Sequence, residues 1–338
     1  YSGGQSWNCC ADLQLYTICG TSWADVLVLG GCASRTASSI AIGELSTVVK
    51  AIEPSSSAWL IVTGDFVRTG GMDRANYALA DYLARSGAVT HLVGFRAAET
   101  LRGMPTVRFH RVPKPLNSYW LSMPLLAAWG RRAAARLTRA GGDVRVVVNG
   151  GNCDWADINW VHYVHRAYAP QVSSSTVARW RVSRFHAAAL RAERRIIPKA
   201  RLVVANSEQT RRDILALSDA LDERRVRTVH YGIDPHLFAP GAARDRVRVR
   251  RDLQLDPDQA VGIFIGALSD HRKGFDVVVE AWRRLLHEQQ MPPTLLVVGT
   301  GREQAMWMHR IAILGLDRFF RFLGFRSDVP DLLRAAGL

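Results

Sequence analysis

Hydrophobic and polar positions along residues 58–240 follow two alternating patterns. Short apolar runs of strand length occur at residues 59–63, 89–95, 107–112, 144–148, 202–205 and 226–230. Between them lie segments in which apolar residues repeat every three or four positions, at residues 73–85, 119–139 and 175–197. Strands that alternate with amphipathic helices predict a parallel sheet with helices on both faces.

The same alternation resumes after a polar and charged stretch at residues 239–258. Strands are expected at residues 260–265, 294–298 and 319–323, and helices at residues 275–287, 302–314 and 329–336. We therefore predict an α/β chain with two Rossmann-like, doubly wound domains, at residues 58–240 and 241–338. Residues 1–57 are predicted to be an N-terminal extension outside both domains.

Composition narrows the class of protein. Apolar residues make up 48% of the 338 residues and charged residues 22%, which is typical of a globular protein. No apolar run is long enough for a membrane-spanning helix. Five cysteines without a framework spacing favour a reducing compartment, so we expect a cytoplasmic protein.

The charge balance indicates anionic partners. The formal net charge is +14, and residues 1–57 contain two basic and four acidic side chains, so the basic excess belongs to the two predicted domains. A basic surface can attract nucleotides, anionic lipids or nucleic acid. The chain carries no nucleic-acid recognition motif, and no nucleic-acid partner is predicted.

One candidate phosphate site lies at residues 266–274, between a predicted strand and a predicted helix. Arg272, Lys273 and Gly274 come directly before that helix. A helix N-terminus presents free N–H groups and a partial positive charge, which suit a phosphate group. The alternative is a solvated basic turn.

Glycines mark two further loops that follow predicted strands. Gly299 and Gly301 resemble part of a dinucleotide-binding fingerprint, but Gln304 stands where the third glycine is expected, and a tight strand-to-helix turn is the alternative. Gly70 and Gly71 could let the backbone approach a ligand closely, or could form an ordinary turn.

Two histidines, His162 and His165, are spaced three residues apart after the predicted strand at residues 144–148. On a helix this spacing could bind a metal ion, but no third ligand is evident, and we predict no metal site. A polar contact with a ligand and a packed or surface position are the other interpretations.

The helix predicted at residues 119–139 has an apolar first half and a basic second half that contains Arg131 and Arg132. This pattern suits a helix that lies in a membrane surface. It also suits a core helix with a basic solvent-exposed face, and Pro124 interrupts both patterns.

Taken in order, the motifs from Trp59 to Ala336 resemble the retaining GT-B glycosyltransferases of the group 1, family 4 class. The resemblance rests on a series of segments, none of which is decisive alone. They are residues 70–74 (GGMDR), 201–207 (RLVVANS), 231–234 (YGID), 272–276 (RKGFD), 296–301 (LVVGTG), 322–324 (FLG) and 328–333 (DVPDLL).

This resemblance implies transfer of a sugar, with retention of configuration, from a nucleotide-diphosphate sugar such as a UDP- or GDP-sugar, without another cofactor. The C-terminal domain would bind the donor and the N-terminal domain the acceptor. The implied catalytic residues are His165, which would lie near the sugar, and its neighbour His162. Gly70 and Gly71 would form the glycine-rich loop. The implied donor-binding residues are Arg272, Lys273, Gly274, Gly299, Gly301, Phe322, Leu323 and Gly324.

Two departures from the family pattern shape our expectations. Ala267 stands where the family usually has an arginine, and Arg272 is the expected substitute. The family's glutamate pair would follow residue 338, and only three of about six strand-helix units of the second domain are present. We therefore predict an incomplete second domain and a C-terminally truncated chain with impaired activity.

Two alternatives to the transferase remain open. One is a non-catalytic module that binds nucleotides or phosphate. The other is a basic protein that binds a membrane surface. If the acceptor is lipid-linked or lies at a membrane surface, the protein is expected to be peripheral on the inner face of the membrane.

Overall fold

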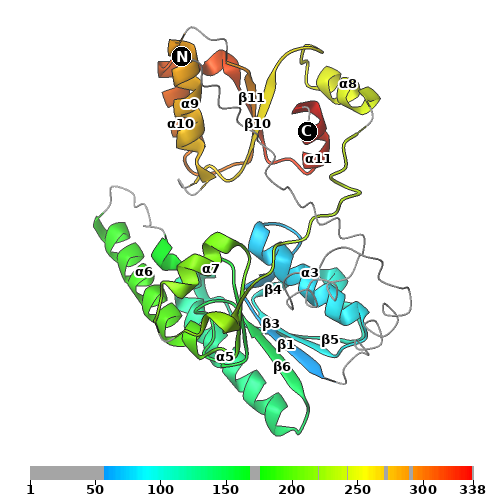
Figure 1. Ribbon diagram of the computed structural model, residues 1–338, viewed down its shortest axis with the longest axis vertical. Helices are drawn as coiled ribbons and strands as arrows, with labels where there is room; N and C mark the ends of the chain where they lie inside the picture. Colours follow the sequence, from blue (N-terminus) through cyan, green and yellow to red (C-terminus); the bar gives the residue numbers. More distant parts are fainter. Residues whose placement is uncertain are drawn as a thin grey trace, which may run out of the picture. The chain divides into compact units, whose positions relative to one another are not determined.

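The computed structural model describes residues 57–167, 176–219, 221–241, 243–269, 273–288 and 292–336. They divide into two compact units, of which the first ends at Tyr231 and the second begins at Gly232 (Figure 1). This division falls before the boundary expected at residue 240. Helix α8 (Ala243–Asp252) occupies much of the polar stretch and packs against α11 (Val329–Ala336) within the second unit. Residues 1–56 and Arg272 lie outside the described residues.

The described part of the first unit contains a seven-stranded parallel sheet, which confirms the α/β prediction. Its order is β5-β3-β1-β6-β7-β8-β9. The strands are β1 (Ala58–Val62), β3 (Thr90–Gly94), β5 (Val107–Arg111), β6 (Val144–Val148), β7 (Ile158–Val161), β8 (Leu202–Ala205) and β9 (Val226–Thr228). A separate parallel pair is formed by β2 (Asp65–Phe66) and β4 (Arg96–Ala97).

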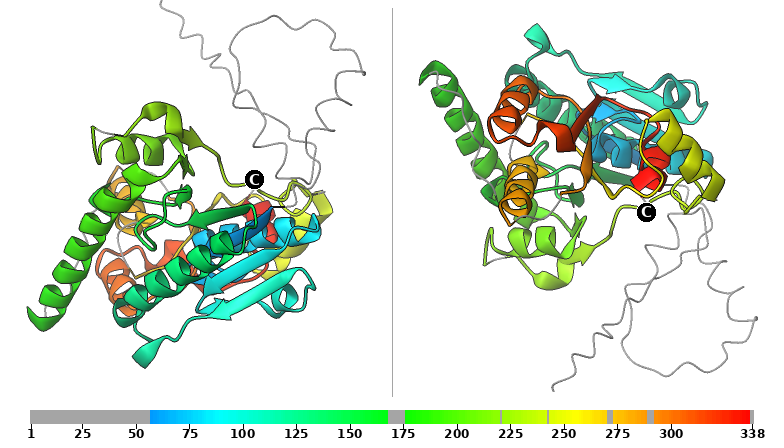
Figure 2. Two further views of the ribbon diagram at one scale, coloured as in Figure 1. Left: turned by 90° about the horizontal axis from the view of Figure 1, so that it is seen from below. Right: turned by 90° about the horizontal axis from the view of Figure 1, so that it is seen from above.

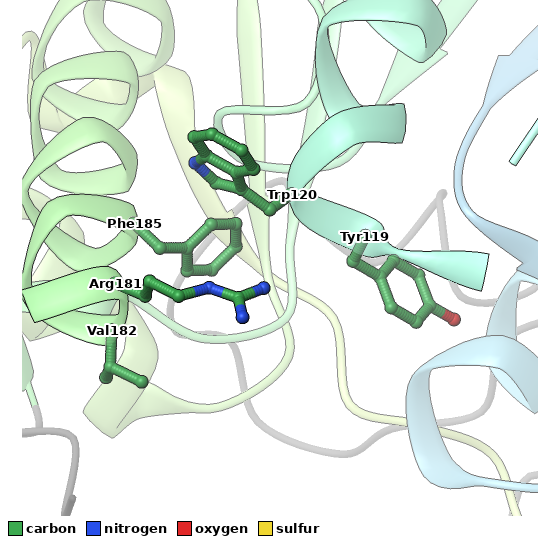
Figure 3. A pocket seen from close by; sticks show the side chains of 5 residues that line it. All are labelled: Tyr119, Trp120, Arg181, Val182 and Phe185. Carbon is green, nitrogen blue, oxygen red and sulfur yellow. The ribbon is translucent and has the colours of Figure 1, made fainter. Parts of the chain in front are cut away.

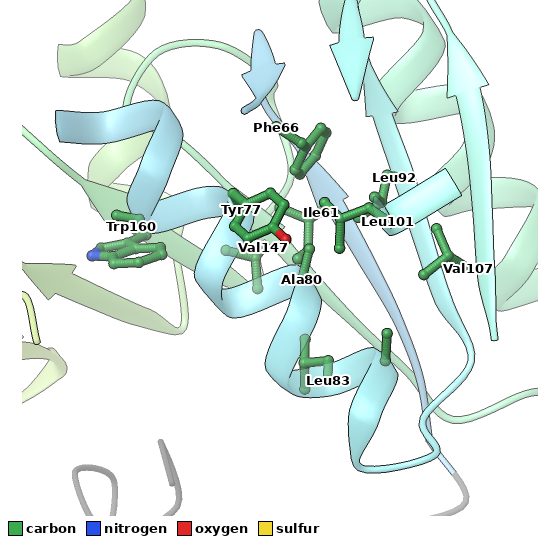
Figure 4. Packing of buried hydrophobic residues seen from close by; sticks show 12 residues of the cluster. Ile61, Phe66, Tyr77, Ala80, Leu83, Leu92, Leu101, Val107, Val147 and Trp160 are labelled. Atoms are coloured by element: carbon green, nitrogen blue, oxygen red, sulfur yellow. The ribbon is translucent and has the colours of Figure 1, made fainter. Parts of the chain in front are cut away.

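Helices of the first unit cover both faces of this sheet because successive strand residues point to opposite sides. Ile61 and Val147 pack with α3 in one core cluster (Figure 4), whereas Leu60 and Val62 pack with α5 in another. The helices are α3 (Gly71–Arg85), α4 (Glu99–Arg102), α5 (Tyr119–Arg139), α6 (Thr176–Ile196) and α7 (Glu208–Leu215). The first half of α6 is largely exposed and extends beyond the sheet (Figure 2).

The described part of the second unit has a three-stranded parallel sheet, β10-β11-β12, again with a core on each face. Aromatic side chains fill the face covered by α9 and α10, and aliphatic side chains fill the face covered by α8 and α11. The elements not yet given are β10 (Val261–Ile265), α9 (Phe275–His287), β11 (Thr294–Val298), α10 (Gln304–Ile313) and β12 (Phe320–Gly324).

A single glycine lets α5 approach the first sheet closely. A Cβ at Gly130 would lie 2.7 Å from Cγ1 of Val62 and 2.9 Å from Sγ of Cys153. Both neighbours are fully buried, so neither can move aside easily. The face of α5 that carries Gly130 is therefore a core face, and the rest of the helix is left to solvent.

We expect Gly130→Val to lower the free energy of unfolding by about 2 kcal/mol, because the added methyl groups overpack a closed core. Urea denaturation followed by circular dichroism measures this change. Arg131→Val is the matched control, since it places the same residue on the exposed side of the same helix. Equal stability of the two variants would contradict the close approach of α5 to the sheet.

Candidate functional site

A buried polar cluster lies beyond the carboxyl ends of β6 and β7, the edge at which doubly wound sheets bind ligands. His162 follows β7 and lies at its centre. Its Nε2 is 2.9 Å from Nδ2 of Asn149 and 3.4 Å from Nδ2 of Asn76, and its Nδ1 contacts the hydroxyl of Tyr231. The ring also packs on Trp160, with centroids 4.8 Å apart.

The partners of His162 define its protonation state. Both amide nitrogens donate, so Nε2 accepts, and Nδ1–H donates to the Tyr231 oxygen. Burial lowers the pKa of His162 to about 4 and raises the pKa of Tyr231 to about 12. Both rings are therefore neutral at pH 7.

Two amide oxygens beside His162 stay available for a ligand. Oδ1 of Asn76 and Oδ1 of Asn149 are buried and have no hydrogen-bond partner among the described residues. Buried polar atoms without a partner are costly in a folded protein. A ligand hydroxyl that donates to them would remove this cost.

His165 belongs to a separate group of side chains, in which a buried carboxylate fixes the orientation of its ring. Glu193 of α6 is 1% exposed, and its Oε1 lies 2.6 Å from Nδ1 of His165. The backbone N–H of His165 also donates to this carboxylate, at 3.0 and 3.1 Å. Nδ1 is thereby committed to Glu193, and Nε2 lies 3.4 Å from the hydroxyl of Tyr163.

Glu193 was not predicted from the sequence, although one signal marked it. It is the only acidic residue of α6, which carries six arginines. The structure also corrects the helical interpretation of the two histidines, because His162 directly follows strand β7 and His165 begins a separate 3₁₀ turn at His165–Ala167. Within the described residues, no group of three or more His, Cys, Asp or Glu side chains could hold a metal ion.

The glycine-rich loop begins α3. Gly70 has a φ of 80° and caps a helix whose first turn receives no side-chain cap, while a Cβ at Gly71 would meet open space. The backbone therefore requires a glycine at position 70 but not at position 71. A role of this loop in ligand binding stays a prediction.

In the second unit, Gly299 and Gly301 allow two loops to pack backbone against backbone. A Cβ at Gly299 would lie 2.0 Å from the Gly266 oxygen, and one at Gly301 would lie 2.1 Å from the Leu268 carbonyl carbon. Hydrogen bonds join the loops, with Leu268 N to Thr300 O at 3.1 Å. This contact explains both glycines without a ligand.

Lys273 and Gly274 lie where the predicted phosphate site places them. Gly274 has a φ of 69° and caps α9 without a side chain, so the first N–H groups of α9 have no side-chain cap. Lys273 is exposed, and its Cγ lies 3.2 Å from the Cβ position of Gly266, so its stem crosses the end of β10.

The remaining predicted donor residues contribute mainly to packing. The Phe322 ring lies 6.2 Å from that of Phe275, and Leu323 packs against the opposite face of the sheet. Gly324 has a φ of 69°, and its oxygen accepts a hydrogen bond from Gly299 at 2.8 Å. A contact of these three residues with a donor stays a prediction.

Residues 69–237, half of the chain, match the family described as Glycosyltransferase Family 4. The chain belongs to glycosyltransferase family 4. Residues 259–338, which lie in the second unit, match the family described as Glycosyl transferases group 1.

Curated relatives of this family 4 chain are D-inositol 3-phosphate glycosyltransferases. The protein of Catenulispora acidiphila is 40% identical over 95 residues, which are 28% of this chain and 22% of the relative. The protein of Corynebacterium jeikeium is 29% identical over 193 residues, 55% of this chain and 45% of the relative. The chain thus spans less than half the length of these relatives.

Solved glycosyltransferases confirm the GT-B fold of this family 4 chain. WaaG is 19% identical with a TM-score of 0.61, covering 83% of this chain and 73% of WaaG. HepE of Anabaena is 18% identical with a TM-score of 0.57, covering 82% of this chain and 72% of HepE. Likeness at this level of identity concerns the fold alone.

The neutral state of His162 predicts a pH dependence of stability. Its pKa falls from 6.5 in the unfolded chain to about 4 in the folded one, so only the unfolded chain gains a proton between these values. The stabilisation is complete above pH 6.5 and is lost as the pH falls towards 4. It amounts to about 3 kcal/mol, from 1.36 kcal/mol per pKa unit.

We therefore expect His162→Gln to flatten the decline of unfolding free energy between pH 7 and pH 4.5. Urea titrations at several pH values measure the slope, which is independent of any constant loss that the substitution causes. His230→Gln, which changes an exposed histidine of the same unit, should leave the slope unchanged. A His162→Gln slope equal to that of the wild type would show that His162 is not buried as a neutral ring.

Proposed function

We propose that this chain transfers a sugar from a UDP-sugar to an acceptor with retention of configuration. HepE has been solved with UDP and with UDP-glucose, which supports this class of donor. The observation that carries the proposal is the position of Lys273 over the end of β10, directly before the uncapped N-terminus of α9. A departing nucleotide diphosphate needs fixed cations and N–H donors, and this segment offers both.

The first unit supplies the groups proposed to face the transferred sugar. Glu193 fixes the ring of His165, and we propose that this fixed ring lies beside a hydroxyl group of the sugar. The unpartnered oxygens of Asn76 and Asn149 can accept hydrogen bonds from hydroxyl groups. In a retaining transfer on one face of the sugar, the acceptor oxygen bonds to the anomeric carbon, the phosphate leaves with the bonding electrons, and the phosphate takes the acceptor proton.

Titration calorimetry with UDP and UDP-glucose tests the donor site. We expect Lys273→Gln to weaken UDP binding by roughly 10- to 100-fold, the worth of a hydrogen bond to a charged group. Lys199→Gln is the control, because Lys199 is a surface lysine paired with Asp154. Equal affinities of the two variants would contradict the proposed phosphate site.

Calorimetry together with an NMR assay of hydrolysis separates the transferase from a non-catalytic nucleotide-binding module. A transferase should bind UDP-glucose with a different affinity from UDP. It should also hydrolyse UDP-glucose slowly, and NMR identifies which anomer of glucose is released before mutarotation. Release of the anomer that UDP-glucose carries would indicate retention. Sugar-independent affinity without hydrolysis would favour the binding module.

A second candidate function, binding to a membrane surface, is favoured by one exposed face of the first unit. We call it the Trp face; it comprises Trp120 of α5 and Trp180 of α6, which are 53 and 60% exposed, with Arg181 and Phe185 of α6 beside them. Trp120 of α5 faces Phe185 and Arg181 of α6 across a pocket of about 310 Å³ (Figure 3). Arg184 lies 5.1 Å from the Trp180 ring centroid.

This face modifies the prediction of an interfacial helix at residues 119–139. Helix α5 packs onto the sheet through Leu126, Gly130 and Ala134, so only its first turn and its arginine side are exposed. Exposed tryptophans beside arginines suit the boundary between lipid headgroups and acyl chains. Among the described residues, no helix combines the length and apolar character needed to cross a membrane.

We expect the chain to sediment with vesicles that contain phosphatidylglycerol and to remain in solution with phosphatidylcholine vesicles. The double substitution Trp120→Glu and Trp180→Glu should lower the bound fraction at least about fivefold, because it removes two apolar anchors and adds two negative charges. Val277→Glu, on the exposed side of α9, controls for an added charge elsewhere. Unchanged sedimentation of the double variant would exclude the Trp face as the membrane contact.

A further inference from the structure

A second cavity of the first unit, of about 720 Å³, opens beyond the carboxyl ends of β3 and β5. We propose that this cavity binds an anionic group, a phosphate or a carboxylate, carried by the acceptor. The inference rests on the proposed transferase function and adds the chemical class of the acceptor. The lining residues are Phe95, Arg96, Arg111, Val112, Pro113, Lys114, Asn117 and Tyr119.

Two cations of this anion cavity lack a carboxylate partner. Within the described part of the chain, neither Arg111 nor Lys114 forms an ion pair. The Lys114 ammonium instead lies 3.5 Å from the centroid of the Tyr119 ring and 5.6 Å from that of Phe95. An aromatic ring holds a cation in place but supplies no carboxylate oxygen in contact with it. An anionic ligand would supply the missing counter-charge.

A buried carboxylate shapes the wall of the anion cavity. Asp65 is 1% exposed, and both its oxygens accept hydrogen bonds from Arg96, at 3.1 and 2.7 Å. The Tyr119 hydroxyl also donates to Asp65, at 3.1 Å. This bidentate pairing fixes the guanidinium plane of Arg96, whose side chain is still 65% exposed and can donate further bonds to a ligand.

The backbone at the rim of the anion cavity is strained. Leu116 and Asn117 are consecutive non-glycine residues with φ angles of 50°. This left-handed conformation is uncommon for non-glycine residues and is found preferentially at functional sites. Pro113 and Pro115 flank Lys114 and restrict its backbone further. The chain therefore holds Lys114 in a defined position at an energetic cost.

Helix α3 connects the anion cavity to the polar cluster around His162. Asp73 of α3 interacts electrostatically with Arg96 and Lys114 of the anion cavity. Asn76, which lies one turn further along α3, contacts His162. Burial, and then the nearby charge of Asp65, raises the pKa of Asp73, whereas the charges of Arg96 and Lys114 lower it. An acceptor anchored by its anion would thus present its remaining groups beside the cluster proposed to face the sugar.

Labelling with pyridoxal 5′-phosphate tests the cavity, because this probe carries both a phosphate and an aldehyde that condenses with lysine. The chain has four lysines, and after borohydride reduction mass spectrometry can quantify Lys114, Lys199 and Lys273 separately. We expect pyridoxal 5′-phosphate to label Lys114 about tenfold faster than pyridoxal does, as for a site that binds the phosphate. Lys199, an exposed lysine, should show little preference.

Substitution of Arg111 completes the test. Arg111→Gln should reduce the preference at Lys114 to that of Lys199, whereas Arg108→Gln should preserve it, since Arg108 lies on the same strand and bonds backbone oxygens outside the cavity. No preference at Lys114, or a preference that survives Arg111→Gln, would overturn the proposal. The effect of UDP on the labelling of Lys273 is measured in the same sample. This separates the two proposals, because the donor site is tested at Lys273 and the anion cavity at Lys114.

Competitors identify the source of the anion. Inorganic phosphate and vesicles of phosphatidylglycerol are each added before labelling at equal phosphate concentration. Stronger protection of Lys114 by free phosphate supports a water-soluble acceptor, and stronger protection by vesicles supports a lipid headgroup. Absence of protection by either competitor would overturn the proposal.

Discussion

Parallel pairing of the strands, which holds for every strand that the structure describes, is the constraint on which the fold within each unit depends. Parallel strands need a crossover after each strand, and all the loops that follow strands then meet at one edge. Residues far apart in the sequence, such as Asn149 and Tyr231, come together around His162 for this reason. In the second unit the same constraint brings the loops after β10, β11 and β12 into direct contact.

Buried polar side chains then fix the loops at that edge. Asn159 is fully buried, and its amide exchanges two hydrogen bonds with the backbone of Gly150, at 2.7 and 2.9 Å. Glu193 and Asp65 act in the same way on His165 and Arg96. A buried polar group is costly unless it is hydrogen-bonded, so each of these contacts specifies one loop conformation. The candidate site is therefore held by groups that need not touch a ligand themselves.

Local pattern predicted the strands that consist mainly of apolar residues. The strands at residues 144–148 and 202–205 agree with the structure because short, mainly apolar runs between polar segments have few alternatives. Strand β7 was missed because it is short and runs directly into the histidine segment. Helix α8 was interpreted as linker because charged residues dominate it, and the packing of Val249 against Leu332 appears only in the tertiary structure.

Some residues of the candidate site could be predicted from neighbouring sequence, and others could not. Lys273 and Gly274 follow from a strand, a loop and a helix that are adjacent in sequence. The pairing of His165 with Glu193, 28 residues away, and of Arg96 with Asp65, 31 residues away, depends on how helices and strands pack. No spacing rule encodes such pairs. The contact of Gly299 and Gly301 with the preceding loop has a consequence for motif searches. Backbone packing alone would require these two glycines even in a chain that binds no nucleotide, so a glycine pair of this kind does not by itself identify a nucleotide site.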